Sequence, residues 1–373
     1  MKKKNTAALI VHTKGLEALH RYFAKYRENY MTKKMKDDTL RKLFCWSPPA
    51  VMSDFTITSR SEAAGSIDGF CIVATFLPEM LLNRHEEVIS KIEAALIESE
   101  KRGAAVASLA AFTSIADGRQ GEIVSRVAKS MAVTNGSTFT SAMAIEGIRK
   151  MCRILDIDIG AANMAIIGAT GSIGRTCSRY FMGKTARLTL TGRKFEKLEK
   201  LFGGYPEQYS NLFLTDDNNG AVADADLVIS VTSSIQSIFK SDAFKSGAVI
   251  CDVGFPKNIA QACNDRDDII VYSGGLARIP GDIEHLDVMG LPANNICYGC
   301  MSEGILLALT ERLDLCTVGL DDIPLRNVDL LTDMGYEHGF DVAPYFNDYK
   351  YYCAEDFDRV KRAREALASS ACV

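Results

Sequence analysis

The stretch IIGATGSIG, residues 166–174, constrains the fold of this chain more than any other feature. The apolar run MAII leads into it and RTCSRYFMG follows with the pattern of a helix, so strand, glycine-rich turn and helix come in order. Glycines let a backbone approach a pyrophosphate, and a helix start offers unpaired N–H groups. The sequence therefore predicts a dinucleotide-binding turn, with cofactor contacts from Gly168, Thr170, Gly171, Ser172, Ile173 and Gly174.

Four further apolar stretches continue this pattern along the chain. They are ARLTLTGRK, DADLVISVTSS, GAVICDVGFPKN and DIIVYSGG, each at the spacing of a βαβ unit. They predict an α/β fold with a Rossmann-type parallel sheet over residues 151–285. Thr232, Ser233 and Gly254 follow two of these strands, and we expect them to line the cofactor site. A plain α/β domain, in which the glycines only form a tight turn, is the alternative.

The end of the second of these strands indicates which nicotinamide cofactor binds. An NAD site usually has Asp or Glu there to hold the ribose 2′-hydroxyl, whereas this chain has Thr191, Gly192, Arg193 and Lys194. A cation suits a 2′-phosphate. We therefore expect NADPH, with Arg193 as the recognition residue, and the alternative is that Arg193 is an ordinary surface residue.

The segment in front of the turn, residues 1–150, has the pattern of a second α/β domain. TAALIVH, DFTITSR and GFCIVATF predict strands, and LEALHRYFAKYREN and EEVISKIEAALIESEKRG predict amphipathic helices. AVASLAAFTSI predicts a strand that ends in a loop, and MAVTNGSTFTSAM predicts a Gly/Ser/Thr-rich turn. The length is usual for a domain.

Composition limits where this protein works and what it binds. No apolar run of the 373 residues reaches the roughly 18 to 20 that a membrane helix needs, and the N-terminus lacks a secretory pattern, so we expect the cytoplasm. The eleven cysteines are scattered, which favours reduced thiols.

The net charge is −4, but residues 1–45 carry twelve Lys or Arg against four Asp or Glu. This excess fits either a solvated helix surface or a docking face for an acidic partner.

Two cysteines close together mark a candidate for the chemistry. LPANNICYGCMSEGILLALTERL predicts an apolar helix introduced by Pro292, with Asn294 and Asn295 as potential caps, so Cys297 and Cys300 would share one face of its first turns. A helix N-terminus favours a thiolate, which a thioester-forming nucleophile requires. A zinc site is not favoured, because no second Cys/His pair at metal-binding spacing follows. A thioredoxin-like redox pair is not favoured either, because that motif opens the helix of a different βαβ arrangement. Two inert core cysteines remain an alternative.

Several motifs together resemble those of the long-chain acyl-(acyl-carrier-protein) reductases, bacterial enzymes that make fatty aldehydes. The similarity is collinear over nearly the whole chain. It is carried by FLPEML at 76–81, AFTSI at 111–115, NGSTFTSA at 135–142, GATGSIG at 168–174, GFPKN at 254–258, GCMSEGILL at 299–307 and EHGF at 337–340.

The resemblance implies a mechanism. The nucleophile of the family falls on Cys300, in a C-terminal helical segment 286–373. This cysteine would take the acyl group from an acyl carrier protein or coenzyme A thioester, and NADPH would then reduce the acyl-enzyme to the aldehyde. The front domain would bind the acyl chain in a cleft against the cofactor domain, with Ser114 and Thr138 as polar contacts, although ordinary turn capping explains both equally well. An aldehyde-consuming enzyme is a further expected partner, and a metal is not expected.

Departures from the family keep two other functions open. The family has a histidine where this chain has Phe139 and a glutamate shortly before the FLPEML motif, and the tail from Val342 onward is added. One alternative is a reductase of another activated acyl group, as in the glutamyl-tRNA reductases, although a pI near 5.8 argues against nucleic acid. The other is a non-catalytic NADP(H)-binding regulator.

Overall fold

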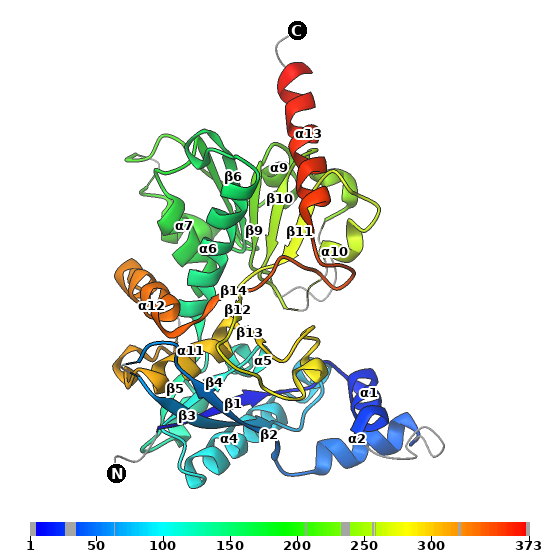
Figure 1. The fold of residues 1–373 in the computed structure, drawn as a ribbon, viewed down its shortest axis with the longest axis vertical. Coiled ribbons are helices and arrows are strands. Elements are labelled where there is room, and N and C mark those ends of the chain that lie inside the picture. Colours follow the sequence, from blue (N-terminus) through cyan, green and yellow to red (C-terminus); the bar gives the residue numbers. More distant parts are fainter. Residues whose placement is uncertain are drawn as a thin grey trace. The chain divides into compact units, whose positions relative to one another are not determined.

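The computed structural model describes residues 5–26, 35–62, 64–205, 207–232, 239–255, 257, 259–319 and 322–370 (Figure 1). Two compact units share the chain. The first comprises Met1–Thr140, Ala277–Asp321 and Leu330–Asp341, and the second Ser141–Leu276, Asp322–Asp329 and Val342–Val373. The domain ranges 1–150, 151–285 and 286–373 remain a prediction. Residues of the last range, 286–373, belong partly to the first compact unit and partly to the second.

The first unit is built on a five-stranded sheet in the order β2-β3-β1-β4-β5. Strands β3, β1, β4 and β5 run parallel, and β2 pairs antiparallel with β3. The central strand is buried along Ala7–Val11, which is typical of a parallel strand covered on both faces. The strands are β1 (Thr6–Val11), β2 (Ala50–Thr58), β3 (Ser66–Val73), β4 (Val106–Leu109) and β5 (Ala132–Thr134).

The helices around this sheet follow the expected periodicity. Val88, Ile92 and Leu96 recur at helical spacing and are all buried on the long helix that ends before Gly103. The AFTSI stretch, expected as a loop, forms a short helix instead. The helices are α1 (Leu16–Tyr26), α2 (Asp37–Trp46), α3 (Met80–Asn83), α4 (His85–Lys101), α5 (Phe112–Ile115) and α11 (Gly299–Leu309), with short 3-10 helices at Val124–Val127, Leu286–Met289 and Leu313–Leu315.

The second unit has the Rossmann fold that the sequence predicts. Its six strands are all parallel and lie in the order β11-β10-β9-β6-β7-β8, the doubly wound order of dinucleotide-binding domains. The strands are β6 (Asn163–Ile167), β7 (Arg187–Thr191), β8 (Leu212–Thr215), β9 (Leu227–Ser230), β10 (Val249–Asp252) and β11 (Ile270–Ser273), and the helices are α7 (Ser172–Phe181), α8 (Phe195–Phe202), α9 (Asn218–Ala223) and α10 (Ile259–Ala262).

A few elements lie where the chain passes from one unit to the other. Helix α6 begins at Ser137 within the expected Gly/Ser/Thr turn, because the Asn135 side chain accepts the Ser137 N–H at 3.0 Å and so caps the helix start. A small sheet has the order β13-β12-β14. These elements are α6 (Ser137–Ile154), β12 (Leu276–Arg278), α12 (Leu325–His338) and β14 (Asp341–Val342), and β13 is Ile296–Tyr298.

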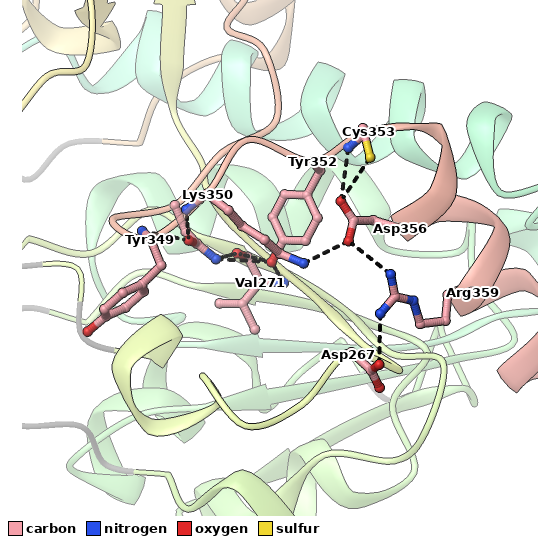
Figure 2. A network of polar contacts seen from close by, with 9 residues as sticks. Asp267, Val271, Tyr349, Lys350, Tyr352, Cys353, Asp356 and Arg359 are labelled. Atoms are coloured by element: carbon pink, nitrogen blue, oxygen red, sulfur yellow. Dashed lines mark hydrogen bonds and ion pairs between the residues drawn. The ribbon is translucent and has the colours of Figure 1, made fainter.

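The added tail packs on the Rossmann unit as a loop and a helix, α13 (Ala354–Ser370). The Tyr352 hydroxyl accepts the Val271 N–H at 3.0 Å and donates to the Val271 carbonyl at 2.9 Å, at the edge strand β11. Arg359 pairs with Asp267 at 2.8 Å (Figure 2). The tail therefore covers an edge of the sheet that would otherwise be open to pairing.

Candidate active site

Cys300 is the second residue of helix α11 in the first unit. Most of this helix is apolar and buried, and it packs against strands β4, β1 and β3 of the five-stranded sheet. Cys300 is partly accessible, whereas Cys297 is fully buried. Only one of the two cysteines can therefore meet a substrate.

The helix begins later than the sequence analysis expects. Cys297 lies in strand β13 and the helix cap is Tyr298, so the two cysteines do not share a helix face. Asn294 and Asn295 precede this cap position and do not cap the helix, and their backbone carbonyls accept the N–H groups of Ile283 and Ile279. This expectation was wrong because strand pairing, which depends on residues distant in sequence, overrides the local capping signal.

The turn after β5 lies directly on Cys300. A Cβ atom added to Gly136 would come within 2.1 Å of the Cys300 Cα, so the two backbones are in contact. Gly136 has φ +67°, which disfavours other residues for the same turn. The fold thus brings into contact the motifs NGSTFTSA and GCMSEGILL, which are over 150 residues apart in sequence.

The surroundings of Cys300 keep it protonated. Burial raises the pKa of the thiol to about 11, backbone hydrogen bonds from Ala111 and Met301 lower it less, and the charge of Glu303 raises it further. The helix N-terminus therefore does not produce a resting thiolate, contrary to expectation, because desolvation outweighs it. Burial also raises the pKa of Cys297 well above its usual value.

The expected substrate contacts differ in what they do. The Ser114 hydroxyl donates to the Ala111 carbonyl at 2.8 Å, so it caps a turn. The Thr138 hydroxyl is buried and has no hydrogen-bond partner among the described residues. Ala111 has φ 51°, an uncommon conformation without glycine that costs about 1–3 kcal/mol and often marks functional sites.

Glu303 is a polar residue of this site that the sequence analysis missed. It is fully buried one helical turn after Cys300, and burial raises its pKa to about 7. The motif GCMSEGILL contains the signal, since a glutamate in an otherwise apolar helix needs partners when it is buried.

The glycines of the predicted cofactor turn have the geometry of a dinucleotide site. Gly168 has φ +84°, and a Cβ on Gly174 would lie 2.3 Å from the Gly168 carbonyl oxygen. Gly171 differs, because its Cβ would meet only the Gly168 oxygen at 3.7 Å. The protein itself leaves room at Gly171, so a close-lying phosphate explains the glycine better than internal packing does.

Other predicted cofactor residues lie around this turn in the second unit. The Ser172 hydroxyl is buried at the start of α7 without a hydrogen-bond partner in the described part of the chain, which suits a phosphate oxygen. A Cβ on Gly254 would lie 2.3 Å from the Thr232 carbonyl oxygen, so β9 and β10 end side by side. Thr170 in the turn and Ile173 in the first turn of α7 are partly exposed. Ser233 lies outside the described residues.

Arg193 follows β7 on the surface. It is exposed and makes no hydrogen bond or ion pair recorded within the described ranges. Thr170 stands beside this strand end, since a Cβ on Gly192 would lie 2.8 Å from its methyl group. The residue next to Arg193 in sequence, Gly192, therefore lies beside the glycine turn.

The described residues lack two other features, a metal site and a membrane-spanning helix. No cluster of three or more His, Cys, Asp or Glu side chains could hold a metal ion. Among the same residues, no helix has both the length and the apolar character needed to cross a bilayer.

The known proteins to which this chain is similar are distant relatives. A family model described as shikimate / quinate 5-dehydrogenase matches residues 150–273. The chain is 28% identical over 312 residues to a long-chain acyl-[acyl-carrier-protein] reductase of Synechococcus elongatus, covering 79% of this chain and 88% of that protein. It is also 28% identical to aminotransferase PigE of a Serratia species over 77% of this chain, but spans only 34% of PigE.

Among solved structures, L-tryptophan dehydrogenase from Nostoc punctiforme is similar with a TM-score of 0.40 and 11% identity, covering 97% of this chain and 90% of that one. The strand order, the glycine turn and the family match define the class: a Rossmann-type oxidoreductase with a nicotinamide cofactor. Within that class, the chain is a distant relative of the Synechococcus reductase.

Proposed function

We propose that this protein is an NADPH-dependent reductase that converts a fatty acyl thioester to the aldehyde through a thioester on Cys300. One observation carries the proposal: the partly accessible Cys300 lies in the first turn of a buried helix, with the Gly136 turn against its backbone, in a chain that also has a dinucleotide turn. The 28% identity to an acyl-[acyl-carrier-protein] reductase supports the acyl substrate.

The proposed reaction has two steps that balance. In the first, the Cys300 sulfur loses its proton and attacks the acyl carbonyl, and the carrier leaves as a thiol that takes up a proton. The bound nicotinamide would supply a hydride for the second step. The acyl carbon then takes up this hydride, the carbon–sulfur bond breaks, and Cys300 leaves as a thiolate that is reprotonated as the aldehyde departs.

The backbone around Cys300 supports the first step. Ala111 and Met301 direct backbone hydrogen bonds to the sulfur, and such donors stabilise the thiolate that forms when the thiol loses its proton. The strained conformation of Ala111 would keep its donor in place without rearrangement during the reaction. The buried Thr138 hydroxyl, which has no hydrogen-bond partner among the described residues, would bond to the acyl group.

The cofactor and the partners are part of the same proposal. The turn Gly168–Gly174, Ser172, Thr232 and Gly254 would hold the dinucleotide, and Arg193 would select the 2′-phosphate. The acyl donor would be an acyl carrier protein or coenzyme A thioester, and an enzyme that consumes aldehydes would take the product.

A second candidate function follows from the pKa of Cys300. A thiol with its pKa raised to about 11 is a weak nucleophile at neutral pH, which favours a non-catalytic NADP(H)-binding protein. The two candidates differ in whether a bound thioester activates this cysteine.

Intact-protein mass spectrometry distinguishes them. The protein is mixed, without NADPH, with acyl-carrier-protein and coenzyme A thioesters of several chain lengths, and Cys300→Ala is the control. We expect an acyl-sized adduct on the wild type alone, which disappears when NADPH is added and releases aldehyde. NADPH binding with no adduct from any thioester would contradict the reductase and favour the second candidate.

A further inference from the structure

The carboxylate of Glu303 has contacts that connect two separate parts of the Cys300 site. Thr134 donates its hydroxyl hydrogen to one carboxylate oxygen, and the Phe139 N–H donates to the other at 2.7 Å. The backbone of Thr138 contributes a further hydrogen bond. Thr134 and Phe139 lie on either side of Gly136, so one side chain on helix α11 holds both ends of the turn.

The turn held in this way is the one that contacts the nucleophile. The Gly136 N–H donates to the Thr134 hydroxyl oxygen at 3.2 Å, and the Gly136 backbone lies against that of Cys300. We propose that Glu303 is a positioning residue: its carboxylate gathers Thr134 and Phe139 and so fixes the turn that carries Gly136 on the backbone of Cys300. The inference rests on the proposed function in taking Cys300 as the nucleophile.

An ionised carboxylate suits these contacts better than an amide would. All the groups directed at Glu303 are donors, and a carboxylate is the side-chain group that only accepts. A glutamine would direct its NH₂ group at one of these donors. These donors lower the pKa of Glu303, although burial has the larger effect and raises it to about 7.

The charge of Glu303 also reaches the thiol that it helps to position. Two titratable groups are coupled to it, the thiols of Cys300 on its own helix and of Cys316 in the segment after that helix, and its charge raises the pKa of each. Strand β5 and the start of α6 contribute uncharged donors. Because burial places the pKa of Glu303 at about 7, its ionisation changes the reactivity of Cys300 near neutral pH.

The test measures iodoacetamide alkylation of Cys300 against pH, by the mass of the Cys300 peptide from the full chain. In the wild type we expect the rate to rise less than tenfold per pH unit around pH 7, since the ionising carboxylate opposes the thiolate. In Glu303→Gln we expect the alkylation rate to rise tenfold per pH unit over the whole range measured. A Glu303→Gln profile that keeps the wild-type flattening would overturn the proposal.

A matched pair at Thr134 covers the case in which Glu303→Gln does not fold. Thr134→Val removes the hydroxyl donor, which raises the pKa of Glu303, so the flattened region should move to higher pH. Thr134→Ser keeps the donor and should match the wild type. Identical profiles for the two variants would refute the inference.

Amide hydrogen exchange tests the position of the turn directly. We expect the peptide 132–140 to exchange at least about tenfold faster in Thr134→Val than in Thr134→Ser, while the peptide 163–167 is unchanged. Equal exchange of 132–140 would contradict a positioning role. Neither measurement uses a thioester or NADPH, so failure of the proposed function and failure of this inference are distinguishable.

Discussion

Burial changes the pKa of several single residues, and His12 shows the effect most simply. Its ring is stacked between Phe76 and Phe112, with ring centroids 5.1 and 5.2 Å away. One ring nitrogen bonds to the Thr13 carbonyl at 2.8 Å, and the other accepts the Phe112 N–H. Desolvation lowers the pKa of His12 to about 4, so the ring is neutral and structural in the folded protein at neutral pH.

This burial predicts how stability depends on pH. Between pH 6.5 and about 4 the unfolded chain binds a proton at His12 and the folded protein does not. Stability from this group is therefore present above pH 6.5 and is lost as the pH falls, by at most about 1.4 kcal/mol per unit. Urea unfolding should show a smaller loss over this range in His12→Gln than in the wild type. The same change in the free energy of unfolding with pH in both proteins would contradict the prediction.

Arg193 is the single residue on which the choice of cofactor depends. Arg193→Ser should raise the Kd for NADPH about tenfold or more and leave the Kd for NADH nearly unchanged, because a charge-assisted bond to the 2′-phosphate is lost. Titration of the nicotinamide fluorescence measures both constants. Lys197→Ser, on exposed α8, is the control and should change neither. An equal effect of Arg193→Ser on both cofactors would argue against this role.

At the scale of elements, the start of α7 separates two roles of glycine. In Gly174→Ala the new Cβ meets the Gly168 carbonyl, so we expect a loss of about 1–3 kcal/mol in the free energy of unfolding. In Gly171→Ala the chain has room, so thermal unfolding should stay near the wild type while NADPH affinity falls by about tenfold or more. Wild-type NADPH affinity in a folded Gly171→Ala protein would exclude a phosphate at this position.

The sequence predicts most elements but fewer of their boundaries. Five of the six Rossmann strands and α4 follow from runs and periodicity, which are local, whereas β8 was not predicted. The start of α11 does not, because β13 takes up Ile296–Tyr298 through pairing in a small sheet. Glu303 also depends on tertiary partners, since only the folded chain brings Thr134 and Phe139 to it.

At the scale of the whole molecule, charge is distributed unevenly. The chain has a net charge of −4, while residues 1–45 hold twelve Lys or Arg against four Asp or Glu. If this excess docks an acidic carrier protein, Lys36→Ala with Lys42→Ala should raise the apparent KM for the acyl carrier protein severalfold at low salt and less at high salt. Both lysines are exposed.

The control for this prediction carries the same charge change elsewhere. Lys197→Ala with Lys200→Ala alters two exposed lysines of α8 and should leave the KM unchanged. An unchanged KM in the Lys36 and Lys42 variant would remove the basis for a basic docking face and leave a solvated surface as its explanation.

By itself, the sequence determined the α/β class and the Rossmann turn with its three glycines, which depend on spacing within short segments, where the chemistry of each residue acts locally. Cys300 as the candidate nucleophile followed from the resemblance of the sequence motifs to a known family. Only the tertiary structure decided that Cys297 is buried, that the Gly136 turn lies on Cys300 and that Glu303 holds this turn. Burial and long-range contact decide these features, because desolvation and packing depend on residues that are far apart in the chain.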